Sequence, residues 1–491
     1  MNMKKILTII LILAMILPAV ISCVDGSKSS GTSETNTGSV VQSNGPADDS
    51  SLTNDQMLMK ISSELPARDF EGYEYIVLTR DEAASPYWFT RDVFSEGLNG
   101  EPINDAVYDR NRILEEKFNI KVLARQSTAT PATPAKAAIL AGEDSFAAFT
   151  DGLNALSALA TANLLLDYNE LPGIKLENNW WDQAMNSGMS IQNRLYFVTG
   201  DISIMDNEGT WHVLFNKDIA EGLNFGNLYD VVNDGKWTLD TMYDIAKKSV
   251  ADLDGDGVMT PWNDRFGLAS EPYNTYSLWV GSGMKIATKN SDDLPELTMY
   301  SDRSVQVIDK ALKLQLDKEI FIDHNTNMDI FMSSTVMFQL VGMRVLPVYR
   351  QSDINFGILP IPKFDEIQEN HYTSFSTYNL TAYSVPITTS DPERTGILLE
   401  ATAALSKYTL TPAYYEISLK GKALRDNESE TMIDIILENR LYDIGVVFNW
   451  GGLLGIFTAM TTGGTNDFAS RYSSLESKAE ADMQKFIDSL E

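Results

Sequence analysis

The residues best suited to bind a metal ion lie in the segment DLDGDGVMTPWND, residues 252–264. Asp252, Asp254 and Asp256 alternate with other residues and are followed by Gly257, the spacing found in the first half of a calcium-binding loop. Ca²⁺ takes six to eight oxygen ligands, and alternating carboxylates around a sharp glycine turn supply several of them. The spacing therefore predicts a Ca²⁺ site.

The second half of the same segment would complete this metal site. The backbone carbonyl of Val258 and the side chain of Thr260 stand at the next two ligand positions. An EF-hand loop ends on a glutamate, but here Asn263 occupies that position and Asp264 follows it. We expect Asp264 to provide the closing ligand. The alternative is an Asp- and Gly-rich turn that binds no ion.

The sequence contains no recognisable catalytic motif. Its three histidines, His212, His324 and His371, are far apart, and Cys23 is the single cysteine, so Cys–His catalysis is excluded and no zinc pattern exists. It has no serine nucleophile elbow, no phosphate-binding loop and no dinucleotide-binding glycine pattern. The 68 Asp and Glu residues leave glycoside hydrolysis as an alternative, but nothing selects a pair. We expect a protein that is not an enzyme.

Strand-like and helix-like segments alternate in the first part of the folded chain. Residues 73–81, 119–125 and 145–152 are rich in aromatic and β-branched residues and are typical of strands. The segments 104–118 and 131–143 have helical apolar spacing or a helix-forming composition. This alternation predicts an α/β fold that contains a doubly wound parallel sheet.

Later segments continue this mixture of strands and helices. The segment 193–224 has strand-like residues on both sides of a connection rich in Asp, Asn and Gly, and then runs into a helix. Thr238 is placed to cap a helix over 239–250, and VLPVYR at 345–350 is expected to be a strand.

Several of these segments, taken in order, resemble a family 1 extracellular solute-binding protein, the lipoprotein subunit of a sugar-type ABC importer. The resemblance rests on the following pieces, which are spread over most of residues 73–490: Tyr196-Phe197 with Gly200-Asp201, LFNKDIAEGLN (214–224), GKWTLDTMYDIAKK (235–248), FGILPIPKFDE (356–366), SDPERTGILLEATAALSKYTLTPAYY (390–415) and YDIGVVFNWGG (442–452). Compared with the maltose-binding type, this chain is longer and has an insertion near residues 83–105.

The resemblance implies a two-lobed fold of the periplasmic-binding-protein type (type II), with lobes joined by crossing hinge strands. Ligand would bind in the cleft between the lobes, which close by hinge motion. We expect crossings at 201–211 and 376–385. The expected lobes are an N-lobe of residues 70–202 plus 385–430 and a C-lobe of residues 204–378 plus 431–490.

The resemblance also implies which side chains would line the cleft. A sugar offers apolar C–H faces to aromatic rings and hydroxyl groups to Asp, Asn, Arg and Glu. The candidates near the crossings and in the C-lobe loops are Asp201, Trp211, Tyr276, Trp279, Tyr349, Arg350, Tyr378 and Trp450. For each aromatic residue, a place in the hydrophobic core is the alternative.

The N-terminus has the layout of an export signal. Lys4 and Lys5 precede an apolar run over residues 6–21, shorter than the span of about 20 residues that a membrane helix needs. Val20-Ile21-Ser22-Cys23 resembles the bacterial lipobox, in which the cysteine is acylated and becomes the mature N-terminus. The alternative is an ordinary signal peptide with an incidental cysteine.

The lipobox resemblance divides the N-terminal region into two parts. Residues 1–22 would be a lipoprotein signal peptide. Residues 23–54, dominated by Ser, Thr, Gly, Asn and Asp after the cysteine, would be a disordered tether. We therefore expect an exported bacterial protein that is lipid-anchored to the cell membrane and faces outward.

The formal net charge of −30 limits the possible partners. Such a surface repels phosphate backbones, so nucleic acid is a poor partner, and a neutral or cationic ligand fits better. The alternative is that the charge serves only solubility. We expect a protein that captures a sugar or oligosaccharide for ABC permease subunits. The alternatives are a binding protein for a peptide, polyamine or other solute, a surface carbohydrate-active enzyme, and a surface sensor or adhesin.

Overall fold

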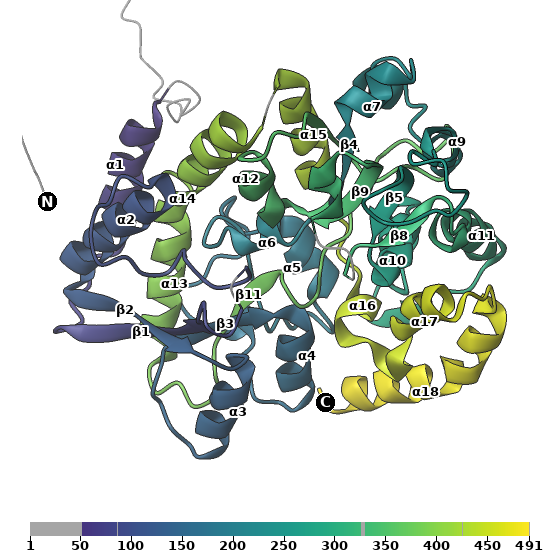
Figure 1. The fold of residues 1–491 in the computed structure, drawn as a ribbon. Coiled ribbons are helices and arrows are strands. Elements are labelled where there is room, and N and C mark those ends of the chain that lie inside the picture. The colour runs from purple at the N-terminus through teal and green to yellow at the C-terminus, as the bar shows by residue number, and fades with distance from the viewer. Residues whose placement is uncertain (1–51, 86, 326–328, 425, 491) are drawn as a thin grey trace, which may run out of the picture. The chain divides into compact units, whose positions relative to one another are not determined.

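Two β-sheets organise the part of the chain that the computed structural model describes, residues 52–85, 87–325, 329–424 and 426–490. The first sheet has the order β11 (Thr381–Ser384), β3 (Ala148–Gly152), β1 (Tyr73–Arg80), β2 (Ile120–Ser127). The second has the order β10 (Phe356–Leu359), β4 (Trp211–Asn216), β9 (Val336–Gly342), β5 (Phe266–Ser270), β8 (Phe321–Asp323). Figure 1 shows the two sheets in different halves of the view.

The first sheet confirms the parallel arrangement predicted from the N-terminal segments. β1 pairs in parallel with β2, with Tyr73 opposite Ile120, and in parallel with β3, with Val77 opposite Ala148. The connections are α2 (Pro102–Phe118) and α3 (Ala132–Leu140). β11, which comes from much later in the chain, adds to β3 in the antiparallel direction.

Helix α2 shows how the local sequence builds this part of the fold. It begins after Glu101, whose side chain accepts a hydrogen bond from the backbone of Asn104, and it ends at Asn119 in the left-handed conformation. Val107, Leu114 and Phe118 recur at helical spacing and are completely buried. The helix therefore covers the sheet with one apolar face.

The second sheet is mixed and buried on both faces. β4 runs antiparallel to β9 and β10, whereas β5 runs parallel to β8 and β9. Every residue of β4, β5, β9 and β10 is buried. A small antiparallel ribbon joins β6 (Ala287–Lys289) to β7 (Pro295–Leu297).

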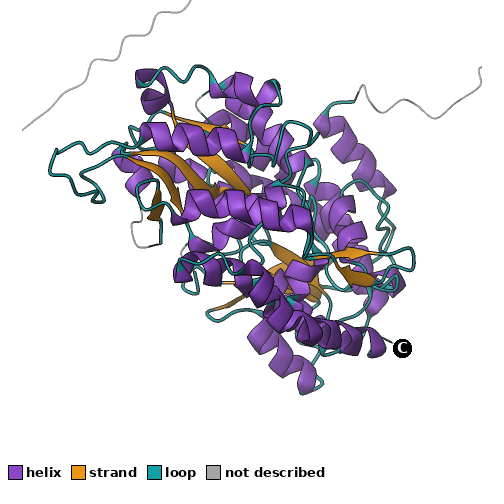
Figure 2. Ribbon diagram, turned by 90° about the vertical axis from the view of Figure 1, so that its right-hand side faces the viewer, coloured by secondary structure: helices purple, strands orange, loops and turns teal. Residues whose placement is uncertain are grey.

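Helices lie on both sides of the strands, as Figure 2 shows. The remaining α-helices are α1 (Asn54–Glu64), α4 (Leu153–Thr161), α5 (Gln183–Met189), α6 (Met205–Glu208), α7 (Lys217–Gly222), α8 (Leu228–Asn233), α9 (Leu239–Ser249), α10 (Thr275–Gly281), α11 (Asp302–Leu316), α12 (Leu346–Tyr349), α13 (Pro392–Ser406), α14 (Leu410–Pro412), α15 (Asn427–Glu438), α16 (Ile444–Phe448), α17 (Gly455–Gly463) and α18 (Phe468–Asp488). Short 3₁₀ helices are η2 (Tyr168–Glu170), η3 (Pro272–Asn274), η4 (Ile330–Ser333), η5 (Met343–Val345) and η7 (Trp450–Gly452), and η6 (Ala413–Ala423) is a π-helix.

The prediction of a strand over 345–350 was wrong. This segment forms the end of η5 and then helix α12, with Pro347 in the first helical turn. Proline suits that position because the first backbone N–H groups of a helix have no intrahelical partner. A short apolar run does not distinguish a strand from a buried helical turn.

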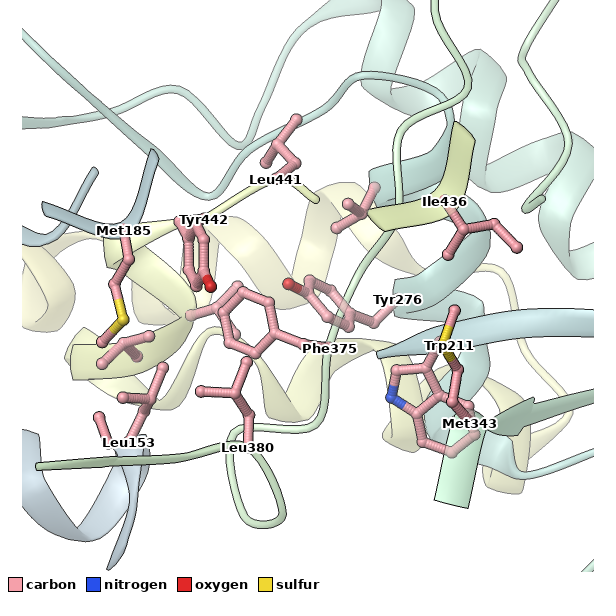
Figure 3. Packing of buried hydrophobic residues seen from close by; sticks show 14 of the residues in the cluster. Leu153, Met185, Trp211, Tyr276, Met343, Phe375, Leu380, Ile436, Leu441 and Tyr442 are labelled. Atoms are coloured by element: carbon pink, nitrogen blue, oxygen red, sulfur yellow. The ribbon is translucent and has the colours of Figure 1, made fainter. Parts of the chain in front are cut away.

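The two segments predicted to cross between lobes lie side by side. Thr210 forms a β-bridge with Phe375, the backbone N–H of Trp211 donates to the carbonyl of Ser374 at 3.0 Å, and that of Ser376 donates to Gly209 at 3.0 Å. A Cβ at Gly209 would lie 2.8 Å from the backbone nitrogen of Leu380, so only glycine permits this approach. Phe375 and Leu380 lie next to each other in Figure 3, and Trp211 belongs to the same buried cluster. The exact lobe limits stay predictions.

The predicted export signal 1–22, the lipidation site Cys23 and all but the last residues of the tether 23–54 lie outside the described residues. Helix α1 begins at Asn54, where Thr53 and Gln56 form a reciprocal capping box. Within the described residues, no helix combines the length and apolar character needed to cross a membrane.

Candidate functional site

A cavity of about 400 Å³ opens beside the two crossing segments. Its walls come from the segment before α2, from β4, from the loops around η3 and η4, from the end of β9 with η5 and α12, and from the second crossing. The lining residues are Tyr87, Trp88, Trp211, Glu271, Tyr273, His324, Asn325, Asp329, Val341, Gly342, Arg344, Val345, Val348, Tyr349, Ser376, Tyr378 and Asn379.

Aromatic rings form much of the cavity wall. Trp211 and Tyr273 lie with ring centroids 6.3 Å apart, and Tyr349 stacks on Phe331 at 6.0 Å. Tyr378 is 60% exposed, so its ring is accessible to solvent at the mouth of the cavity. These rings can cover the apolar faces of a ligand.

Two hydrogen-bond donors at the cavity are buried without a partner among the described residues. They are the indole Nε1 of Trp211 and the hydroxyl of Tyr273. Buried polar groups in native proteins are nearly always paired, so these two donors, on residues that line the cavity, are candidates for a hydrogen bond to a ligand. Both groups can donate a hydrogen bond to a hydroxyl oxygen.

The only cationic side chain among the described lining residues is held by a buried acid. The Nη1 atom of Arg344 donates to Glu208 Oε1 at 3.0 Å and to Oε2 at 2.8 Å. Arg91 pairs with the same carboxylate, and the Glu208 side chain is only 2% exposed. Glu208 thus fixes the guanidinium of Arg344 and shares its single negative charge between Arg344 and Arg91.

His324 and Tyr349 form a neutral part of the wall. Burial lowers the pKa of His324, so its imidazole is uncharged near neutral pH. Its Nδ1 lies 2.9 Å from Nε2 of Gln339. Burial raises the pKa of Tyr349 to about 12, so its hydroxyl stays protonated.

Three of the residues predicted for the cleft line this cavity: Trp211, Tyr349 and Tyr378. Arg350 lines a neighbouring cavity of about 250 Å³, together with Arg91 and Glu208.

The other four predicted residues do not line the cavity. Tyr276 and Trp279, in α10, are completely buried against Phe457, with ring centroids 5.6 and 5.1 Å from its ring. Figure 3 shows Tyr276 among other buried side chains. Trp450 is buried and stacks on Phe448 at 5.3 Å.

Asp201, the fourth, forms its interactions with other residues of the protein. Its carboxylate accepts from Thr411 Oγ1 at 2.6 Å and pairs with Lys407 Nζ at 3.3 Å.

Sequence reasoning missed several lining residues, chiefly Tyr87, Trp88, Glu271, Tyr273 and Arg344. Tyr87 and Trp88 belong to the insertion near 83–105 that the sequence identified without assigning it a role. Its aromatic run YWF, before the first crossing and outside any strand pattern, was an available signal.

The acidic loop 252–264 brings the three alternating carboxylates together. Oxygen atoms of Asp252, Asp254 and Asp256 lie within 4.8 Å of one another, and the side chains are exposed. Gly257 has a φ of 79°, which the sharp turn requires and glycine adopts easily. This donor set of hard oxygens fits a divalent cation such as Ca²⁺.

Asp264 holds the two ends of this loop together. It is completely buried and accepts from the backbone of Leu253 at 2.9 Å and of Thr260 at 2.7 Å. The hydroxyl of Thr260 also donates to Asp264, and the backbone N–H of Val258 donates to Asp256 at 2.7 Å. In this arrangement Asp264 orders the loop, and its role as closing ligand stays a prediction.

Comparison with known proteins shows similarity in structure alone. No protein-family model and no curated protein sequence matches the chain. A cyclo/maltodextrin-binding protein complexed with maltotetraose aligns with a TM-score of 0.57 and 16% identity, over 85% of this chain and 98% of that one. The galacto-N-biose/lacto-N-biose I-binding protein of a Bifidobacterium longum ABC transporter, in complex with lacto-N-biose, aligns with a TM-score of 0.56 and 13% identity, over 85% and 98%. The chain therefore has the two-lobed α/β fold of the maltodextrin-binding type, as the sequence resemblance predicted.

Proposed function

We propose that this protein captures a sugar or oligosaccharide in the cavity lined by Trp211, Tyr273 and Tyr378. The observation that carries the proposal is the combination, at one cavity, of several aromatic residues, of which Tyr378 is exposed, with two unpaired buried donors. Rings cover the apolar faces of a sugar, while the Trp211 indole and the Tyr273 hydroxyl bind its oxygen atoms.

The size and position of the cavity support this proposal. A volume of about 400 Å³ lies within the range of about 300–1,000 Å³ typical of small-molecule sites. It lies beside the crossing segments, where closure of the lobes would bury a ligand. The similar structures described above include complexes with maltotetraose and lacto-N-biose.

Export, lipid anchoring and delivery complete the proposal. Acylation at Cys23 would hold the protein on the outer face of the cell membrane, with residues 23–54 as tether. The closed form would present both lobes to the permease subunits of an ABC importer, so a ligand acts by favouring closure. No chemical step is part of this function, and the protein is proposed not to be an enzyme.

Isothermal titration calorimetry of the mature lipoprotein in detergent tests the function. We expect saturable binding of at least one member of a saccharide panel that includes maltotetraose and lacto-N-biose, with no new reducing ends after long incubation. Binding of only peptides or polyamines would contradict the sugar assignment. Turnover of a polysaccharide would instead identify a surface carbohydrate-active enzyme.

We further propose a structural Ca²⁺ on the loop 252–264. Asp252, Asp254 and Asp256 would hold the ion through carboxylate oxygens, with the carbonyl of Val258 and the side chain of Thr260 as further ligands. The convergence of the three carboxylates supports this assignment. The ion would tie down an exposed loop and take no part in solute binding.

A further inference from the structure

The charged side chains that line the cavity carry a net negative charge. Glu271 and Asp329 are its acids, and Arg344 is its cation. Arg344 shares the single carboxylate of Glu208, which lies behind the wall, with Arg91. Among the described residues, neither Glu271 nor Asp329 belongs to an ion pair, so both acids lack a cation.

Both acids lie near the same turn, residues 323–325. Glu271 interacts electrostatically with Asp323, and Asp329 interacts with His324. Burial, together with the charge of Asp323, raises the pKa of Glu271. A partly buried carboxylate beside another acid is stabilised by a cation placed next to it. His324 does not provide that cation, because burial lowers its pKa.

The rings around these acids also suit a cation. The Tyr273 hydroxyl interacts electrostatically with both Glu271 and Tyr378, so the rings and the acid border the same space. A positive group over an aromatic face is attracted by its negative π surface. Aromatic rings next to an acid therefore favour an ammonium group carried by a ring that has apolar C–H faces.

We propose that the solute is a saccharide that carries a free, protonated amino group, and that this group binds at Glu271 and Asp329. The inference rests on the proposed function and names its substrate class. Trp211 and Tyr273 bind the ring and hydroxyl groups, as described above. The net charge of −30 adds attraction for a cationic solute.

A matched pair of oligosaccharides tests this proposal: a β-1,4-linked glucosamine tetramer and its fully N-acetylated counterpart. Both are titrated calorimetrically into the mature lipoprotein at mildly acidic pH, with maltotetraose and spermidine as further probes. We expect the free-amine tetramer to bind at least tenfold more tightly than the acetylated one. Its affinity should fall with added salt, because the interaction is between charges.

Variants separate the charge of the cavity from the overall charge. Glu271→Gln should weaken binding of the free-amine tetramer about tenfold, and Asp329→Asn should weaken it to a smaller extent. Glu366→Gln, at an exposed acid that does not line the cavity, should leave it unchanged. Thermal melts check that each variant is folded.

The possible failures can be told apart. If the acetylated tetramer or maltotetraose binds as tightly as the free-amine tetramer, the amine inference is wrong and the sugar-binding function stands. If no saccharide binds while spermidine does, the sugar-binding function itself is wrong, and the amino-sugar proposal is overturned with it.

Discussion

The indole of Trp88 packs directly against Gly342, where no side chain intervenes. A Cβ at Gly342 would lie 3.2 Å from Cη2 of Trp88 and 3.2 Å from the backbone oxygen of Glu208. Trp88 comes from the segment before α2, Gly342 ends β9 and Glu208 ends α6. The contact therefore joins three distant parts of the chain at the cavity wall, and the position of Trp88 depends on the absence of a side chain at Gly342.

Gly342→Ala should weaken solute binding without unfolding the protein. The backbone φ of Gly342 is −77°, which alanine adopts freely, so the added methyl group acts only by pushing on its neighbours. Overpacking of this kind costs about 1–3 kcal/mol. We expect Kd for the bound saccharide to rise about fivefold or more, measured by calorimetry, with a small fall in Tm.

Gly97→Ala is the matched control for this prediction. Gly97 lies in the same segment as Trp88, and a Cβ there would meet nothing within 4 Å. Affinity should be unchanged in this variant. Equal effects of the two substitutions would show that the Trp88–Gly342 contact does not shape the site.

Trp211→Phe should reduce affinity more than stability. The Nε1 of Trp211 has no partner among the described residues, so the substitution removes no internal hydrogen bond. It does remove a donor to the solute, and a hydrogen bond worth about 1 kcal/mol corresponds to about a fivefold rise in Kd. Calorimetry and chemical denaturation measure the two effects.

Trp237→Phe provides the contrast. Trp237 is completely buried and its Nε1 donates to the carbonyl of Pro360 at 2.8 Å. Loss of that bond leaves a buried carbonyl unpaired. Trp237→Phe should therefore lower the free energy of unfolding by about 1–3 kcal/mol more than Trp211→Phe does. If Trp211→Phe lowers the free energy of unfolding as much as Trp237→Phe does and leaves Kd unchanged, Trp211 is not part of the binding site.

Removal of divalent metal should lower the melting temperature if the loop 252–264 binds Ca²⁺. An ion present at a hundredfold excess over its Kd stabilises the folded state by about 2.7 kcal/mol. EDTA should therefore lower Tm, and added Ca²⁺ should restore it. Asp254→Asn should abolish this response, because Asp254 supplies one of the converging carboxylates. A melting curve indifferent to EDTA and Ca²⁺ would mean that the loop binds no ion.

Stability should fall as the pH drops because of His212, which is buried in β4. Burial lowers its pKa to about 3, whereas the unfolded chain has the ordinary value of 6.5. At a pH between these two pKa values, the unfolded chain therefore binds a proton at His212 and the folded protein does not. The contribution is fully present above about pH 6.5 and is lost as the pH falls towards 3, at about 1.4 kcal/mol per pH unit.

His212→Leu isolates this contribution from other titrating groups. The variant should show a free energy of unfolding that depends less steeply on pH between 6.5 and 4, measured by urea denaturation at several pH values. Parallel pH curves for the variant and the wild type would show that His212 does not contribute.

The parallel strands β1, β2 and β3 could be predicted from the sequence because each has a local signature of aromatic and β-branched residues followed by a helical pattern. The carboxylates of the loop 252–264 could be predicted for a similar reason. Their convergence follows from residues only a few positions apart, around a glycine turn.

The members of the cavity could not be predicted in the same way. Tyr273 lines the cavity, whereas Tyr276, three residues later, is completely buried. Both are tyrosines in one short segment, and their different surroundings come from what packs against η3 and α10. Likewise, Tyr349 reaches the wall from a helix that the sequence presented as a strand.

The sequence by itself determined the alternation of elements, the helix caps and the spacing of acidic residues, because each depends on neighbours along the chain. Only the tertiary structure decided that Trp88, Trp211, Glu271 and Tyr378 share one space. These residues are far apart in sequence, and long-range packing of the two sheets and their crossing segments brings them together. A ligand site of this kind is a property of that packing, and residue type alone does not reveal which aromatic side chains belong to it.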